Sequence, residues 1–185
     1  MNLDHGCSNI NYSEITQMKK LYFLTLVALG FSANSFAQSF VTATSTATII
    51  TPISIAKNLD MNFGNIAVNP TTPGGTVTLS ASASPVRTPT VGLTLPAVTG
   101  LVQAASFTVT GEGSSVYTIT LPNSISLTGP GAAMAITPNC SVSTLTSAAL
   151  TSGTQVFYVG GTLTVAAVQV AGAYSGTFSV NVNYN

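Results

Sequence analysis

Residues whose side chains could perform acid–base, nucleophilic or metal chemistry are scarce in this 185-residue sequence. It has one histidine, His5, and two cysteines, Cys7 and Cys140. Charged residues make up 4% of the chain, against about 25% in ordinary soluble domains. They are Asp4, Glu14, Lys19, Lys20, Lys57, Asp60, Arg87 and Glu112. The formal net charge is zero, so no basic surface predicts nucleic acid as a partner.

The segment 18–37 has the three parts of an export signal. Lys19 and Lys20 precede an apolar run over 21–31, and the small residues Ser35 and Ala37 follow it. The run is too short to span a membrane, and this order of parts is typical of a cleavable signal peptide. We therefore expect cleavage between Ala37 and Gln38, and a product in the periplasm, at the cell surface or outside a bacterial cell.

Residues 1–17 form a polar preface that signal peptides rarely carry, and Met18 is a better start, so we interpret 1–17 as an upstream extension. The mature chain, 38–185, then keeps Lys57, Asp60, Arg87 and Glu112 but no histidine. Its single cysteine, Cys140, could pair with another chain or remain a free thiol. The favoured interpretation is a small buried apolar residue.

This inventory predicts a protein that is not an enzyme. A serine or cysteine nucleophile needs a neighbouring base, and zinc needs clustered cysteines and histidines. Asp60 and Glu112 could in principle form a glycosidase pair. However, Asp60 begins a predicted strand, and Glu112 lies between two glycines at a predicted hairpin tip. We therefore predict no catalytic residue, no metal ligand and no cofactor.

Apolar and polar residues alternate through most of the mature chain, as in 106–110 (SFTVT) and 178–184 (FSVNVNY). Such alternation, rich in Val, Ile, Thr and aromatic residues, is typical of half-buried strands. The expected strands are 39–50, 53–56, 59–68, 75–83, 91–95, 104–110, 115–121, 132–137, 155–159, 162–168 and 174–184.

Glycine and proline signals separate these runs. They lie at Asn69-Pro70, 73–75, 111–113, 129–131, 137–139, Gly160-Gly161 and Gly172. Short strands at close spacing predict one antiparallel β-sandwich over 53–185, immunoglobulin-like or pilin-like, with no transmembrane helix. Four tyrosines fall at strand positions and are expected in the core or at an interface: Tyr117, Tyr158, Tyr174 and Tyr184.

The new N-terminal segment, 38–52, is either a first strand or an extension. Val41, Ala43, Ser45, Ala47 and Ile49 alternate on one face of it. Natural sheets protect their edge strands with charges, and this chain has almost none. The segment could pair within its own subunit, or it could add a strand to a neighbouring one as in donor-strand complementation. Both alternatives remain open at this point.

Several strings resemble an exported bacterial family catalogued as domain of unknown function number four-four-zero-two. They are 59–66 (LDMNFGNI), 74–79 (GGTVTL), 105–111 (ASFTVTG), 117–122 (YTITLP), 157–165 (FYVGGTLTV) and 173–184 (AYSGTFSVNVNY). This resemblance implies secretion and a β-fold, and it implies no activity. The C-terminal dozen residues are also similar to spore coat protein U and archaic chaperone–usher pilins.

These observations favour a structural or assembly protein of the cell surface: a pilin-like, fimbrial subunit that associates with itself or with sister subunits. The alternative is a secreted binding module that acts in cell adhesion. Its loops, such as 84–90 and 96–104, would then recognise a glycan or a protein ligand.

Overall fold

The computed structural model describes residues 17, 19, 20, 38–69 and 73–185. Apart from those first three positions, the predicted signal peptide, its cleavage residue Ala37 and the upstream segment lie outside the described residues. The chain divides into two compact units, Met1–Ala47 and Thr48–Asn185. Every strand of the described residues belongs to the second unit.

The second unit has twelve strands and a single 3-10 turn at Leu145–Ser147 among its described residues. The strands are β1 (Ser54–Leu59), β2 (Ala67–Val68), β3 (Gly74–Leu79), β4 (Arg87–Pro89), β5 (Leu93–Thr94), β6 (Ala105–Thr110), β7 (Val116–Thr120), β8 (Ile125–Leu127), β9 (Met134–Cys140), β10 (Ala148–Ala149), β11 (Thr154–Ala166) and β12 (Asn181–Tyr184). Each strand pair is antiparallel, which confirms the predicted all-β class.

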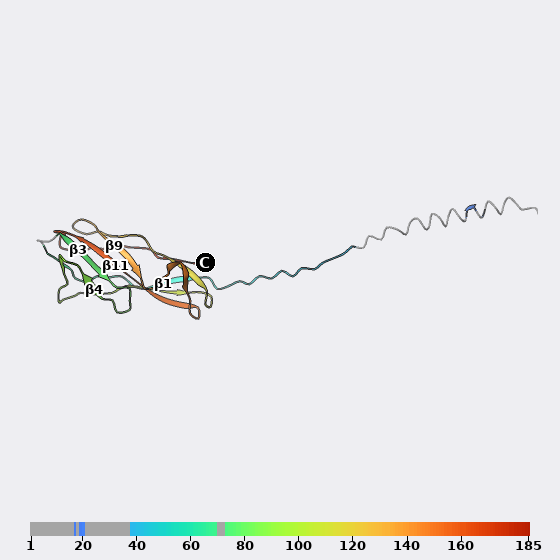
Figure 1. Cartoon of the computed structure of the whole chain (residues 1–185), viewed down its shortest axis with the longest axis horizontal. Helices are drawn as coiled ribbons and strands as arrows, with labels where there is room; N and C mark the ends of the chain where they lie inside the picture. The colour runs from blue at the N-terminus through green and yellow to red at the C-terminus, as the bar shows by residue number, and fades with distance from the viewer. Residues whose placement is uncertain (1–16, 18, 21–37, 70–72) are drawn as a thin grey trace, which may run out of the picture. The chain divides into compact units, whose positions relative to one another are not determined.

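Two main sheets form the layers of the sandwich. The larger sheet has seven strands: its path is β1-β6-β11-β3-β4, with β9 beside β11 and β8 beside β9. Figure 1 shows β3, β11 and β9 lying side by side in this layer. The second sheet has the order β10-β7-β12, and β2 pairs with β5 in a short ribbon. Side chains of both main sheets share one core, so the predicted β-sandwich is confirmed.

The core consists of two clusters placed along the length of the sandwich. The first lies between the two main sheets and is built around Phe157, Tyr117 and Val109, which are completely buried. Phe107 stacks on Phe157 with ring centroids 5.4 Å apart. The second cluster lies on the half of the larger sheet that contains β3, β8, β9 and the end of β11. No strand of the second sheet contributes a buried residue to this second cluster among the described residues.

The strands correct three of the expected turns: β11 and β9 run through two of them, and β3 includes Gly74 and Gly75 of the turn expected at 73–75. The thirteen residues of β11 run straight through Gly160-Gly161, where the sequence predicted a break between two strands. A side chain at Gly160 would collide with the carbonyl oxygen of Leu79, and one at Gly161 would lie 2.6 Å from Ile136. The glycines therefore allow close approach of neighbouring strands. The turn expected at 137–139 is also absent, because β9 continues through it and Pro138 pairs with Gly161.

Three expected strands form ladders only in part or not at all. Residues 38–52 belong to no strand, and every one of them is exposed. Of 59–68, only its last two residues form β2; of 174–184, only the last four before Asn185 form β12. The sequence pattern is right for strands in these regions, but a pattern does not supply the neighbouring strand that a ladder needs.

Candidate strand-binding groove

A groove of about 990 Å³, partly open to solvent, lies over the second core cluster. Its two walls come from opposite ends of the domain sequence, the segments 57–68 and 169–178. Its floor is formed by side chains of β8, β9 and β11: Ile125, Leu127, Met134, Ile136, Leu163 and Val165. The groove is therefore apolar at its base and bordered by backbone along both sides.

Both walls continue edge strands. In the larger sheet β1 is terminal, and in the three-stranded sheet β12 is terminal. Past the end of β1, residues 60–66 have one bridge, Asn62 with Gln103; before β12, residues 176–180 belong to no strand. Yet Phe178, Val180, Val182 and Tyr184 alternate with exposed residues as in a strand. Residues 176–180 thus have the pattern of a strand without a ladder, and such a segment is a template for another strand. Several backbone groups of 60–66, in contrast, are already hydrogen-bonded within the domain.

Polar contacts hold the first wall from outside the groove. The guanidinium Nη1 of Arg87 donates to the carbonyl oxygens of Phe63 and Asn65, at 2.7 and 2.8 Å. The Asn65 amide donates to the carbonyl oxygen of Thr99 at 2.7 Å. Because hydrogen bonds from charged donors are stronger than neutral ones, Arg87 is the firmest of these attachments.

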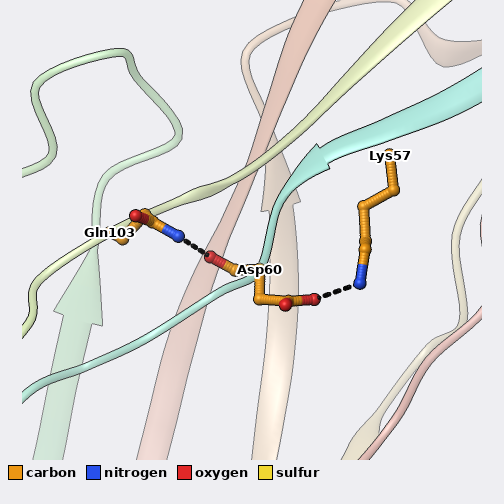
Figure 2. A network of polar contacts seen from close by, with 3 residues as sticks. All are labelled: Lys57, Asp60 and Gln103. Atoms are coloured by element: carbon orange, nitrogen blue, oxygen red, sulfur yellow. Dashed lines mark hydrogen bonds and ion pairs between the residues drawn. The ribbon is translucent and has the colours of Figure 1, made fainter.

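Asp60 fixes the part of this wall that directly follows β1 (Figure 2). Its carboxylate pairs with the Lys57 ammonium at 2.6 Å, and its carbonyl oxygen accepts from the side-chain amide of Gln103 at 2.8 Å. Gln103 also exchanges two backbone hydrogen bonds with Asn62. The ion pair is exposed, so we expect it to contribute little stability by itself.

Glu112 holds the start of the same segment, just before β1. Its carboxylate accepts from the backbone amide of Thr51 at 3.1 Å. This hydrogen bond keeps the pKa of Glu112 below its ordinary value of 4.5. The phenol of Tyr184 closes the arrangement: it donates to the Thr51 carbonyl oxygen at 2.9 Å and accepts from the Glu112 amide at 2.6 Å.

All four charged residues of 38–185 are thus engaged on one stretch of chain, 51–65. Lys57 and Asp60 belong to it, while Arg87 and Glu112 reach it from outside. Because residues 38–185 carry only four charged side chains, their gathering on one stretch of chain indicates a shared structural role. The ionic groups position one backbone segment, which is the base of the N-terminal extension and the first wall of the groove.

The predicted site residues are placed as follows. Asp60 and Glu112 have different partners, Lys57 and Thr51, and are not joined as a carboxylate pair. Asp60 follows the end of β1 and does not begin a strand. The predicted hairpin tip at Glu112 is wrong, because β6 and β7 belong to different sheets and Glu112 lies in the loop between them. Cys140 is a free, half-buried thiol packed against the first core cluster, and burial raises its pKa. Among the described residues, no group of three or more His, Cys, Asp or Glu side chains could hold a metal ion.

The four tyrosines differ in burial. Tyr117 is completely buried and donates to the side-chain oxygen of Gln155 at 2.5 Å. Tyr158, Tyr174 and Tyr184 are half-buried, and Tyr174 lies in the second wall of the groove. Within the part of the chain that the structure describes, no helix has the length and apolar character needed to cross a membrane.

The expected donor face is fully accessible. Val41 is 91% exposed and Ile49 is 99% exposed, although both are large apolar residues. Sequence reasoning found this segment but missed the groove, the role of Arg87 and the contact of Tyr184 with Thr51. The alternation of 59–68 and 174–184 predicts strands, but it does not show that these two segments lie on opposite sides of one groove.

No curated protein and no solved structure matches this chain. A family model does match, over residues 53–184, which covers the whole sandwich including both walls of the groove. The likeness to spore coat protein U and archaic pilins stays a prediction. The first resemblance is confirmed: the chain belongs to the family described as Domain of unknown function (DUF4402).

Proposed function

We propose that the mature chain, residues 38–185, is an exported, non-enzymatic subunit of a bacterial surface assembly that polymerises by strand addition. The groove receives the segment 38–50 of another copy. One observation carries the proposal: the chain has both an apolar groove bordered by edge segments and an exposed alternating segment that belongs to no strand. The groove offers an apolar surface that could be covered, and the segment offers exposed apolar side chains that could cover it.

The two features match in length. The first wall, 57–68, has twelve residues, and the segment 38–50 has thirteen. At about 3.3 Å per residue, each spans about 40 Å when extended. The donor is therefore long enough to follow the wall, which is interrupted as a strand at Gly64, where φ is +67°.

The two features also match in side-chain character. On the donor face, Val41 and Ile49 are separated by the small residues Ala43, Ser45 and Ala47. The floor beneath the groove is lined by Leu, Ile, Met and Val side chains. Burying a valine or isoleucine side chain contributes about 1.5–3 kcal/mol, so Val41 and Ile49 would supply most of the apolar stabilisation.

Composition supports the same role. Residues 38–185 carry four charges, all used inside the domain, so recognition between subunits rests on shape and backbone pairing. The signal-like segment 18–37 supports export. Assembly should then be nearly independent of salt, because few exposed charges are available for screening.

Electron microscopy of the secreted chain in negative stain tests the proposal. We expect linear polymers of similar length and number from low salt to about 1 M salt. A chain that stays monomeric at high protein concentration, or a polymer that dissociates steeply as salt rises, contradicts strand addition as the basis of assembly.

A second candidate function is binding of a glycan or protein ligand through the loops 84–90 and 96–104. The observation in its favour is that these segments, the first of which contains β4, expose Val86, Val98 and Leu101 by 66%, 77% and 59%. A glycan array and a pull-down with the secreted chain distinguish the two: a specific ligand with no polymer supports adhesion, and a polymer with no ligand supports assembly.

A further inference from the structure

We propose that Thr51, Glu112 and Tyr184 form a latch that directs the N-terminal segment to a second copy of the chain and prevents it from filling the groove of its own subunit. This inference rests on the proposed function. It decides between the two pairings, within one subunit or between subunits, that the sequence pattern left open.

The latch is a closed ring of three hydrogen bonds. Thr51 uses both of its backbone groups: its amide donates to the Glu112 carboxylate at 3.1 Å, and its carbonyl accepts from the Tyr184 phenol at 2.9 Å. The Glu112 amide donates to the same phenol at 2.6 Å. Thr51 is thereby fixed both to the loop that joins β6 to β7 and to the last strand.

Packing around the phenol leaves it little freedom. A side chain at Gly111 would collide with the Tyr184 oxygen, so glycine is required there for the ring to close. The Gly111 amide itself donates to the carbonyl oxygen of Gly153 at 2.9 Å, which attaches the β6–β7 loop to the residues just before β11. The latch is therefore attached to a rigid part of the domain.

Filling its own groove would require the segment to reverse direction at the latch. The groove wall begins at Lys57, and β1 is already paired from Ser54 onwards. The latch restricts a reversal within residues 51–53, and the structure has no turn or bend between residues 48 and 53. Pro52 adds to this restriction, because a residue that precedes proline is driven to extended backbone. With Thr51 held at both backbone groups, the chain enters β1 without turning.

Addition between copies then gives a head-to-tail contact. Such an interface joins two different surfaces of the subunit, and it generates an open linear polymer unless rotation closes it into a ring. The latch thus fixes the position from which the donor segment of one subunit extends, and that segment binds in the groove of the next subunit.

Cross-linking of the full mature chain tests the proposal. Cysteines are introduced at Ala47→Cys in the donor segment and at Ala67→Cys in the exposed part of the wall. A bis-maleimide is then applied to a mixture of isotope-labelled and unlabelled chains. Cys140 alone serves as the background control, because burial raises the pKa of its thiol and disfavours the reactive thiolate.

With the latch intact we expect a ladder of multimers and linked peptides of mixed isotope. In the same background, Tyr184→Phe removes the phenol oxygen but keeps the ring. It should raise the ratio of self-linked monomer to ladder roughly fivefold, the effect of one neutral hydrogen bond. Glu112→Gln keeps an acceptor for Thr51, and Tyr158→Phe removes a phenol oxygen outside the latch. Both should retain the unmodified ratio.

Glu112→Ala provides a second variant in case Tyr184→Phe folds poorly, since Glu112 lies in a loop between strands. It too should raise the ratio. Self-linked monomers as the main product of the intact chain overturn the latch but leave strand addition at the groove in place. An unchanged ratio in both latch variants also overturns it. Polymers that form with no link between positions 47 and 67 overturn the latch and the groove together, and no polymer at all overturns the proposed function itself.

Discussion

The phenol of Tyr184 donates a hydrogen bond to the carbonyl oxygen of Thr51, across 133 positions of sequence. The contact joins the entry of the domain to its last strand, where the second-to-last residue of the chain lies. Because the same oxygen accepts from the Glu112 amide, one phenol satisfies two backbone groups.

We expect Tyr184→Phe to lower the free energy of unfolding by about 1–2 kcal/mol, because two backbone groups lose a half-buried partner. Urea denaturation monitored by fluorescence or circular dichroism measures the change. Tyr158→Phe is the matched control, and it should stay within about 0.5 kcal/mol of the unmodified chain. Equal effects of the two substitutions contradict a special role for Tyr184.

Arg87 should matter more than any other charged residue. Arg87→Ala leaves the carbonyl oxygens of Phe63 and Asn65 without their charged donor, so we expect a loss of about 2 kcal/mol and faster hydrogen exchange at residues 63–66. Lys57→Ala removes only an exposed ion pair and should cost less than about 0.5 kcal/mol. Arg87→Lys, which keeps a charged donor, should fall between the two. A larger loss for Lys57→Ala than for Arg87→Ala would falsify this ranking.

Stability should be flat across neutral pH and fall at both extremes. The hydrogen bond from Thr51 lowers the pKa of Glu112 in the folded state, so its contribution is present above about pH 4.5 and is lost as pH falls through the lowered pKa. Burial raises the pKa of Tyr117 to about 12, so stability declines as pH rises from about 10 towards 12.

Thermal denaturation across a pH series checks both limbs of this profile. Tyr117→Phe removes the group that titrates at the alkaline end, and Glu112→Gln removes the one at the acid end. Each variant should flatten only its own limb. A Tyr117→Phe profile with an unchanged alkaline decline assigns that decline to another group.

The two faces of the N-terminal segment should differ in their tolerance of charge. Ala47→Asp places a carboxylate on the face expected to enter the groove, where an unpaired charge is costly, and it should abolish polymers. Thr46→Asp adds the same charge at the neighbouring position on the opposite face and should be tolerated. Light scattering and microscopy of the two secreted variants provide the comparison. Polymers of Ala47→Asp at normal yield would mean that this face stays in water.

The sequence was sufficient for the fold class and for the positions of the regular strands. Alternation at β6 and β7 predicted both strands within a residue or two, because the buried residues Phe107 and Val109, and Tyr117 and Ile119, alternate with more exposed ones. It failed at Gly160-Gly161, since glycine also serves close packing between strands and does not signal a turn alone. The short strands β4, β8 and β10 were missed, because two or three residues are too few to show a period.

The candidate site was predictable only in its donor half. Residues 38–50 stand out by alternation and position in the sequence, whereas the groove arises from segments about 100 residues apart. The role of Arg87 could not be predicted either. It donates to backbone carbonyl oxygens, which every residue has, so no partner side chain identifies the contact in the sequence.

The continuity of β11 has a consequence for how the domain melts. Its first half pairs with β6 beneath one cluster of buried side chains, and its second half pairs with β3 and β9 beneath the other. Neither end of the sandwich can lose its order without releasing a strand that the other end requires. We therefore expect heat or denaturant to open the domain in one cooperative step, with coincident transitions from probes placed at either end.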